Sequence, residues 1–197
     1  DETIVDDYGM DKYENIMGNE NDLPIMSITN QMHGNTLTTN NYPKSGLGYL
    51  YVKDLLGDSL FFKALHHYIK TWNGKHPMPY DFFNCMNTGS GEDLHWFWKR
   101  WFFESGYADL TIKQVTQTDS ITTIQVENLG TKPVPVDLQI TFEDGGKKKL
   151  HHDVSCWKSG QSTFIIEFEE SRKIKSITLG DTYTPDANKQ NNLYEVK

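Results

Sequence analysis

Between residues 42 and 106, apolar side chains recur at the three- and four-residue spacing of amphipathic helices. The first repeat ends at Gly57, a residue type that often terminates a helix, and Asp58 is placed to cap the next helix. The stretch "NGKHP" ends the second repeat, and a short third helix is expected over Tyr80 to Met86. The apolar positions of the first two repeats are Leu47, Leu50, Tyr51 and Leu55, then Phe61, Leu65, Tyr68 and Trp72.

A fourth helix is predicted for the stretch "LHWFWKRWFF", which follows a Ser90-x-x-Asp93 spacing that resembles a capping box. Its apolar residues lie on more than one side, because Trp96 and Phe103 fall outside the main stripe. Such a helix is typically buried on more than one side. Packing against neighbouring helices or domains is therefore favoured over a carbohydrate platform or a membrane anchor. The main stripe consists of Leu94, Phe97, Trp98, Trp101 and Phe102.

In the second half of the chain the period of the apolar residues changes to two. Three alternating runs centre on Ile124, Ile140 and Ile166, and the turn-forming stretches "NLGTKP", "EDGGK", "KSGQ" and "ESRK" separate the expected strands. Six or seven short strands indicate an antiparallel β-sandwich of the immunoglobulin-like type. The predicted fold class is multi-domain α and β: a helical portion at residues 1–107, then a β-sandwich domain at residues 108–197, with the boundary near "ESGYADL".

The first 40 residues are less clearly patterned. The stretch "VDDYGMDKYENIM" is compatible with a helix, and "MHGNTLTTNN", rich in Thr, Asn and Gly, is typical of a loop. Tyr42 comes directly after this loop and just before the first helix. Taken alone, Tyr42 is interpreted as an aromatic side chain packed at a helix start, and the alternative is a hydroxyl group positioned for catalysis. Lys44 is expected to cap the helix, pair locally or lie in solvent.

Composition narrows the classes of partner. The chain has 197 residues, of which 37% are hydrophobic and 13% aromatic, as expected of a folded globular protein. Its formal charge of −8 argues against nucleic acid as a partner, because phosphate binding needs a concentrated basic surface. The basic run Lys147 to Lys149 is interpreted as a solvated hairpin tip. No apolar run reaches the ~20 residues of a membrane helix, so no membrane span is expected.

The start of the chain and its cysteines give weaker indications. The chain opens at Asp1 without an initiator Met, which suggests a processed or truncated product. Cys85 and Cys156 form neither a metal-spaced pair nor a disulfide framework. The cysteines therefore do not indicate whether the protein functions in an oxidising or a reducing compartment.

Several familiar catalytic signatures are absent from this sequence. None of the 7 histidines lies in an H-E-x-x-H motif or has another histidine four residues later, so a helical two-histidine zinc site is missing. There is no G-x-S-x-G motif, phosphate loop or dinucleotide fingerprint, and neither cysteine lies in a nucleophile signature. Taken alone, the chain lacks the parts of an enzyme.

The order of its motifs nevertheless resembles the zinc aminopeptidases of the aminopeptidase N family, which are gluzincin metallopeptidases. The stretch "NNYPKSGLGYLYVKDLLGDSLFFKALHHYIKTW" is similar to the family's Y-x-K element and the helix after it. The stretches "KHPMPYDFF" and "GEDLHWFWKRWFFESGYADLTI" are similar to the helices that lead into the family's β-sandwich. The resemblance runs from Pro24 to Ile112, and "DTYTPDANKQNNLYE" is similar to the tail of bacterial members.

This resemblance implies that the chain is the carboxy-terminal piece of an enzyme that removes amino-terminal residues from peptides. Zinc would belong to the full-length enzyme, with its ligands and the general-base glutamate before Asp1, so that this chain holds no metal ligand or cofactor and is inactive alone. Tyr42 would be catalytic: its phenol, protonated at neutral pH, would donate a hydrogen bond to the substrate's carbonyl oxygen as negative charge develops there. The bacterial-like tail suggests a periplasmic or secreted location.

Partners follow from the same resemblance: a peptide substrate and the missing amino-terminal catalytic region, for which an apolar face should be exposed on this chain. Two alternatives stay open. One is a non-catalytic module whose immunoglobulin-like domain binds a protein or a glycan, and the other is a structural relative that never had the metal site. An H-E-x-x-H motif upstream would favour the aminopeptidase, and a ligand bound by residues 108–197 alone would favour the binding module.

Overall fold

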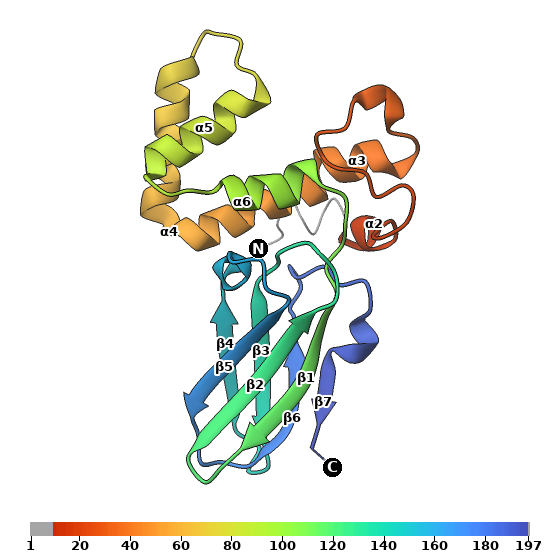
Figure 1. Cartoon of the computed structure of the whole chain (residues 1–197), viewed down its shortest axis with the longest axis vertical. Coiled ribbons are helices and arrows are strands. Elements are labelled where there is room, and N and C mark those ends of the chain that lie inside the picture. The colour runs from red at the N-terminus through yellow and green to blue at the C-terminus, as the bar shows by residue number, and fades with distance from the viewer. Residues whose placement is uncertain (1–9, 197) are drawn as a thin grey trace.

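A computed structural model describes residues 10–196, which form a helical part set on one end of a β-sandwich (Figure 1). Residues 5–9 of the helix expected at "VDDYGMDKYENIM" lie outside the described residues, and α2 occupies the middle of that stretch. The helical part contains α2 (Met10–Glu14), the 3-10 turn η1 (Thr29–Gln31), α3 (Asn35–Asn41), α4 (Pro43–Trp72), α5 (Pro79–Ser90), α6 (His95–Trp98) and the π-helical turn η2 (Lys99–Phe103).

The sandwich consists of two antiparallel sheets, one with strand order β1-β2-β5 and one with order β4-β3-β6-β7. Every second residue of β3 is buried, as the alternating pattern around Ile140 predicts. The predicted fold class, a helical segment followed by an antiparallel β-sandwich, is confirmed. The elements are β1 (Leu110–Gln117), β2 (Ile121–Asn128), β3 (Val136–Phe142), β4 (Lys147–His152), η3 (Val154–Trp157), β5 (Thr163–Glu169), β6 (Ile174–Leu179), η4 (Lys189–Asn191) and β7 (Leu193–Glu195).

Glycines shape the helical part at two kinds of position. Gly57 has φ 68° and ψ 163° and interrupts α4 where the sequence predicts a helix end. Gly48 and Gly89 instead allow close packing: a Cβ on Gly48 would lie 2.4 Å from the ring of Trp101, and one on Gly89 would lie 2.6 Å from the Cα of Ala64. The two glycines therefore bring α4 into direct contact with the helix of Trp101 and with α5.

Four expectations about local structure were wrong. The stretch "NTLTTNN" is helix α3 and not a loop, and its buried residues Thr36, Thr39 and Asn40 show that tertiary packing overrides a weak helix propensity. Ser90 does not cap the fourth helix, because it is the last residue of α5 and α6 begins only at His95, with Leu94 at the cap position. The third helix runs to Ser90, well beyond Met86. Lys147 to Lys149 begin strand β4 and do not form the turn itself.

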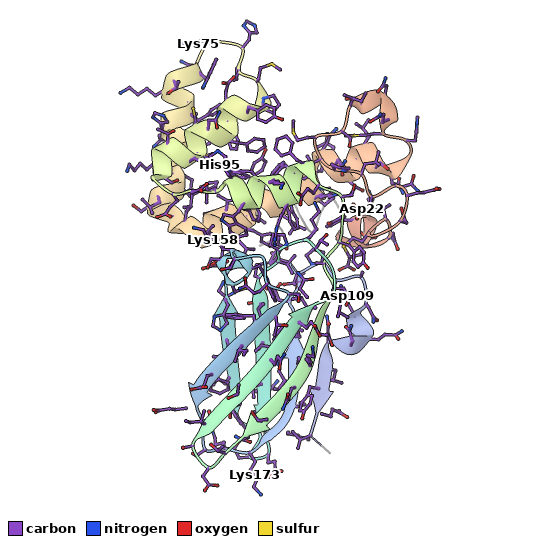
Figure 2. All side chains as sticks on the ribbon, in the orientation of Figure 1. Asp22, Lys75, His95, Asp109, Lys158 and Lys173 are labelled. Carbon is purple, nitrogen blue, oxygen red and sulfur yellow. The ribbon has the colours of Figure 1, made fainter. Side chains whose placement is uncertain are left out.

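One continuous hydrophobic core includes residues of both the helical part and the sandwich, and side chains fill the region where the two parts meet (Figure 2). The stripe predicted for the fourth helix is buried throughout, and Trp101 at its centre is completely buried. The ring of Trp101 stacks on Phe97 and meets Tyr51 edge-on, so α4 and the α6–η2 helix pack through aromatic side chains.

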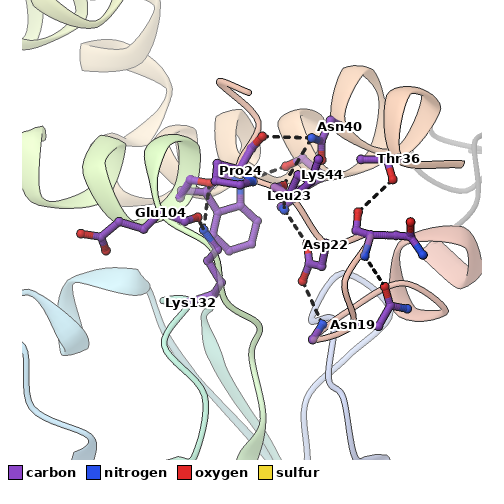
Figure 3. Close-up of polar contacts among 12 residues, drawn as sticks. Asn19, Asp22, Leu23, Pro24, Thr36, Asn40, Lys44, Glu104 and Lys132 are labelled. Carbon is purple, nitrogen blue, oxygen red and sulfur yellow. Dashed lines mark hydrogen bonds and ion pairs between the residues drawn. The ribbon is translucent and has the colours of Figure 1, made fainter. Parts of the chain in front are cut away.

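The last turn of the α6–η2 helix receives its polar partners from elsewhere in the chain. The final carbonyl groups of a helix have no partner within it, and a buried helix end must find other donors. Lys132, in the loop between β2 and β3, provides three of these bonds: its Nζ donates to the main-chain carbonyls of Arg100, Trp101 and Glu104 (Figure 3). The amide of Met26 donates to the carbonyl of Phe102 at 3.0 Å.

Lys132 is fully buried, which is rare for a lysine unless its charge is well compensated. Burial lowers its pKa to about 7, and the nearby charge of Lys44 adds to this effect. The three carbonyl oxygens act in the opposite direction, since an ammonium group has three N–H bonds to donate and a neutral amine only two. A positive charge at a helix carboxyl end also interacts favourably with the helix dipole. Lys132 thus ties the sandwich to the helical part.

We expect Lys132→Met to lower the free energy of unfolding by about 3 kcal/mol, because it leaves buried carbonyl groups without donors while keeping the volume of the side chain. Urea denaturation followed by tryptophan fluorescence measures this difference. The matched control is Lys149→Met, which removes an exposed lysine and should change stability by less than about 0.5 kcal/mol. Equal effects of the two substitutions would contradict a structural role for the buried ammonium group.

Candidate functional site

Tyr42 is the single residue between α3 and α4. Its backbone is bonded to both helices: its amide donates to the carbonyl of Thr38, and its carbonyl accepts from the amide of Gly46. The tyrosine side chain is 49% exposed, while the residues two positions before and after it, Asn40 and Lys44, are completely buried. The expectation of a loop before Tyr42 was wrong, because Tyr42 lies at a junction held by two helices.

Asn40 and Lys44 fix this junction by binding the same short segment of backbone (Figure 3). The Asn40 amide nitrogen donates to the carbonyls of Leu23 and Pro24 at 3.3 and 3.1 Å. The Lys44 ammonium donates to the Leu23 carbonyl at 2.8 Å and to the Asp22 carboxylate at 2.6 Å. The two side chains that flank Tyr42 in sequence therefore both hold residues 22–24 in place.

The sequence suggests that Lys44 caps the helix, pairs locally or lies in solvent. This expectation was wrong, because the partner of Lys44 is a buried carboxylate 22 residues earlier. Its side chain and that of Asp22 form an ion pair that is almost entirely buried. Burial lowers the pKa of Lys44, and the charge and hydrogen bond of Asp22 oppose this shift. The buried ring of Tyr13 lies beside the ammonium group, with its centroid 5.6 Å from Nζ.

The backbone of Lys44 is held as well as its side chain. Its carbonyl accepts a hydrogen bond from the indole of Trp101 at 2.9 Å. Through this bond the start of α4 is fixed to the same helix turn that Lys132 binds. The Y-x-K spacing has a physical meaning here, since the lysine anchors the backbone in the core while the tyrosine, two residues earlier, stays at the surface.

A cavity of about 500 Å³ lies next to the junction. Asn41 and Ser45, the near neighbours of Tyr42, line it, whereas Tyr42 itself is not among its lining residues. The remaining wall is rich in aromatic and sulfur-containing side chains from α4, α5, η2 and the segments before η1 and α5, namely Met26, Tyr49, Tyr68, Met78, Phe82, Phe83 and Phe102. The catalytic role predicted for Tyr42 stays a prediction.

A second cavity, of about 540 Å³, lies between α4 and the sandwich. Its polar residues include His151 on β4, whose ring bridges two carboxylates. His151 Nδ1 lies 2.7 Å from Asp137 Oδ1 on β3, and Nε2 lies 3.0 Å from Asp54 Oδ2 on α4. Both nitrogens can donate only in the protonated ring, so this geometry favours the imidazolium form. The contact joins the helical part to the sandwich.

The charges in this contact reinforce the same protonation state. Burial alone would lower the pKa of His151, but the hydrogen bonds and charges of Asp137 and Asp54 outweigh burial and raise it. Burial raises the pKa of Asp137, against the hydrogen bond from His151 that lowers it. Sequence reasoning missed this cluster because His151 and Asp54 are 97 residues apart.

No group of three or more His, Cys, Asp or Glu residues that could hold a metal ion occurs within residues 10–196. The described residues therefore do not fit a zinc site, and the expectation that zinc ligands lie outside this chain stays a prediction. None of the described helices is both long enough and apolar enough to cross a membrane.

Comparison with known proteins finds similarity among solved structures. No protein-family model and no curated protein sequence matches the chain. Among solved structures, it is similar to Legionella pneumophila aminopeptidase A in complex with aspartic acid, with a TM-score of 0.58 and 20% sequence identity over 73% of this chain. The fold is aminopeptidase-like. The matched region spans 17% of the length of that structure.

We expect Lys44→Met to lower the free energy of unfolding by about 3 kcal/mol, because Asp22 would be left as an unpaired buried charge. Combining it with Asp22→Asn should cost less than the sum of the two single substitutions, since the double variant buries no charge. Chemical denaturation of the four proteins measures the coupling. Lys63→Met, at an exposed position on α4, is the control, and strictly additive effects would contradict the buried ion pair.

His151 should make stability depend on pH. Its pKa in the folded chain lies above the value in the unfolded chain, so its contribution is fully present below about pH 6.5 and is lost as pH rises through the folded-state pKa. Relative to His151→Gln, the wild-type chain should be more stable at pH 5.5 by about 0.5 kcal/mol, a value typical of partly exposed pairs, and this advantage should fade by pH 8.5.

Thermal melting of both proteins across this pH range measures the difference. His76→Gln, at an exposed position outside this contact, should show no such trend. An advantage for wild type that grows with rising pH would contradict the bridging imidazolium.

Proposed function

We propose that this chain is the carboxy-terminal part of a zinc-dependent aminopeptidase and that Tyr42 donates a hydrogen bond to the carbonyl oxygen of the scissile peptide bond. As the carbonyl is attacked, its oxygen gains negative charge, and a phenol O–H aimed at that oxygen stabilises the charge. The zinc ligands are assigned to polypeptide outside this chain, since the described residues do not fit a metal site.

The observation that carries this function is the clamped junction around Tyr42. Catalytic donors must be held within a fraction of an ångström of their working position, and this requires a rigid support. Asn40 and Lys44 give Tyr42 such a support, because both are buried and both bind the Leu23 carbonyl. The similarity of the fold to that of an aminopeptidase supports this proposal.

The surface around Tyr42 is consistent with a further polypeptide packed against it. Tyr49 and Leu50, both about two turns further along α4, are 37% and 41% exposed, and Met78 and Tyr80 at the start of α5 are 67% and 60% exposed. These residues border the cavity beside the junction or lie close to it in sequence. Apolar surface of this kind marks an interaction site, and we assign it to the missing catalytic region.

The alternative function, a non-catalytic module whose sandwich binds a protein or a glycan, has less support. The two largest cavities described here are lined wholly or partly by helical residues. A cavity lined by sandwich residues alone, around Gln139 and Lys149, measures about 220 Å³, which is below the usual range for small-molecule sites.

In the full-length enzyme, Tyr42→Phe should reduce kcat for hydrolysis of an aminoacyl anilide about a hundred- to a thousandfold, the usual cost of losing one such donor. KM and bound zinc should change little, because the phenyl ring keeps its place and no ligand is altered. Steady-state kinetics and metal analysis of the purified enzyme measure these quantities.

Tyr194→Phe is the matched control, since it removes a phenol on β7, outside both the junction and the surface assigned to the missing catalytic region, and it should leave kcat unchanged. The 197-residue chain alone should hydrolyse no anilide. Undiminished turnover by Tyr42→Phe would exclude the tyrosine from the reaction, and anilide hydrolysis by the isolated chain would overturn the assignment of the zinc site to other polypeptide.

A further inference from the structure

The cavity between α4 and the sandwich has a composition unlike that of the cavity beside Tyr42. Its volume of about 540 Å³ falls in the range of small-molecule sites. Three carboxylates line it, and they come from separate parts of the chain: Asp54 on α4, Asp137 on β3 and Asp181 in the loop after β6. No metal-binding group is formed by these residues within the described chain.

The two basic side chains that line the cavity, Lys53 and His151, already form ion pairs with carboxylates. The Lys53 ammonium pairs with Asp58 at 3.2 Å, and Asp58 is not a lining residue. His151 is shared between Asp54 and Asp137. Asp181 accepts hydrogen bonds from the Tyr183 amide at 2.7 Å and the Thr184 hydroxyl at 3.0 Å, which are neutral donors. The lining therefore carries more negative than positive charge.

Aromatic rings form much of the remaining wall. Tyr49, Tyr51, Phe61 and Tyr183 line the cavity. The hydroxyl of Tyr51 donates to the carbonyl of Tyr183 at 2.5 Å, which joins α4 to the loop that carries Asp181. Burial raises the pKa of Tyr51 well above its ordinary value, so the hydroxyl stays protonated and this bond persists. Carboxylates combined with aromatic faces are the groups that attract organic cations.

We propose that this cavity binds a small organic cation, an amidinium, guanidinium or ammonium group carried on a flat apolar body. The apolar body packs against the aromatic wall, and the cationic group lies toward Asp181 and the edge of the Asp54–Asp137 pair. This site is separate from Tyr42 and does not depend on the aminopeptidase function.

His151 competes with such a ligand, because the protonated ring neutralises part of the charge that the ligand requires. Loss of the His151 proton leaves the cavity more negative, so affinity for a cation should increase with pH. This trend is opposite in sign to the stabilising effect of the same histidine. The charged and titratable groups around His151 are Lys53, Asp54, Asp137, Lys149, His152 and Asp181.

Benzamidine is a suitable probe, and benzamide is its neutral counterpart of the same shape. Titration of the 197-residue chain at pH 7.5 and low salt, followed by NMR, should show benzamidine binding with a Kd in the millimolar range and perturbing the Tyr51, His151 and Tyr183 signals. Benzamide should bind at least about tenfold more weakly, because it lacks the charge. Equal binding of the two compounds would overturn the proposal.

Asp181→Asn should weaken benzamidine binding about three- to tenfold and leave the fold intact, because the Asn side-chain oxygen still accepts from Tyr183 and Thr184. Asp119→Asn removes the same charge from an exposed turn that does not line the cavity. It should have no effect, and an equal loss in both variants would show a general attraction to an acidic protein and would overturn the site.

Between pH 5.5 and 8.5, benzamidine affinity of the wild type should rise about three- to tenfold. In His151→Gln this rise should be largely absent. Affinity that falls with rising pH, or a rise that persists undiminished in His151→Gln, would contradict the assigned role of the histidine at this cavity.

Discussion

The architecture depends on main-chain carbonyl groups that lie in the core and receive hydrogen bonds from two buried ammonium groups. Lys132 binds the end of the α6–η2 helix, and Lys44 binds residues 22 and 23, between α2 and η1. Trp101 connects the two, because its own carbonyl accepts from Lys132 while its indole donates to the carbonyl of Lys44. A buried ammonium group without such partners would cost several kcal/mol, so these side chains specify where each helix end must lie.

This network also explains how an exposed tyrosine can be held in a defined place. Tyr42 itself contributes little to the core, yet the residues two positions away on each side are among the most deeply buried in the chain. The buried side chains of Asn40 and Lys44 thus hold the backbone of the exposed Tyr42 in place. The carboxyl end of the chain plays a similar part in the sandwich: Asp186 accepts from the Leu110 amide and the Asn192 side chain, so the "PDANKQNN" stretch fixes the start of β1.

The sequence predicts those features that arise from local periodicity. The break at Gly57, the buried stripe around Trp101 and the alternating strand around Ile140 all follow from spacing along one element. Features that depend on distant partners are not predictable in this way. Lys44 finds its carboxylate 22 residues earlier, and Lys132 binds carbonyls about 30 residues earlier, so each resembles an ordinary surface lysine in sequence. Helix α3 was missed for the same reason, since burial of Thr36, Thr39 and Asn40 stabilises it where propensity does not.

The position of Lys132 in the chain has a consequence for synthesis. During translation the α6–η2 helix leaves the ribosome before the loop that carries Lys132, and Tyr51 precedes its acceptor, the Tyr183 carbonyl, by 132 residues. The residues of the helical part therefore emerge before the residues that complete these hydrogen bonds. The contacts can form only after the β-sandwich has been synthesised. A nascent chain stalled before residue 132 would present an unfinished helix end and uncovered aromatic side chains, the kind of surface that chaperones bind.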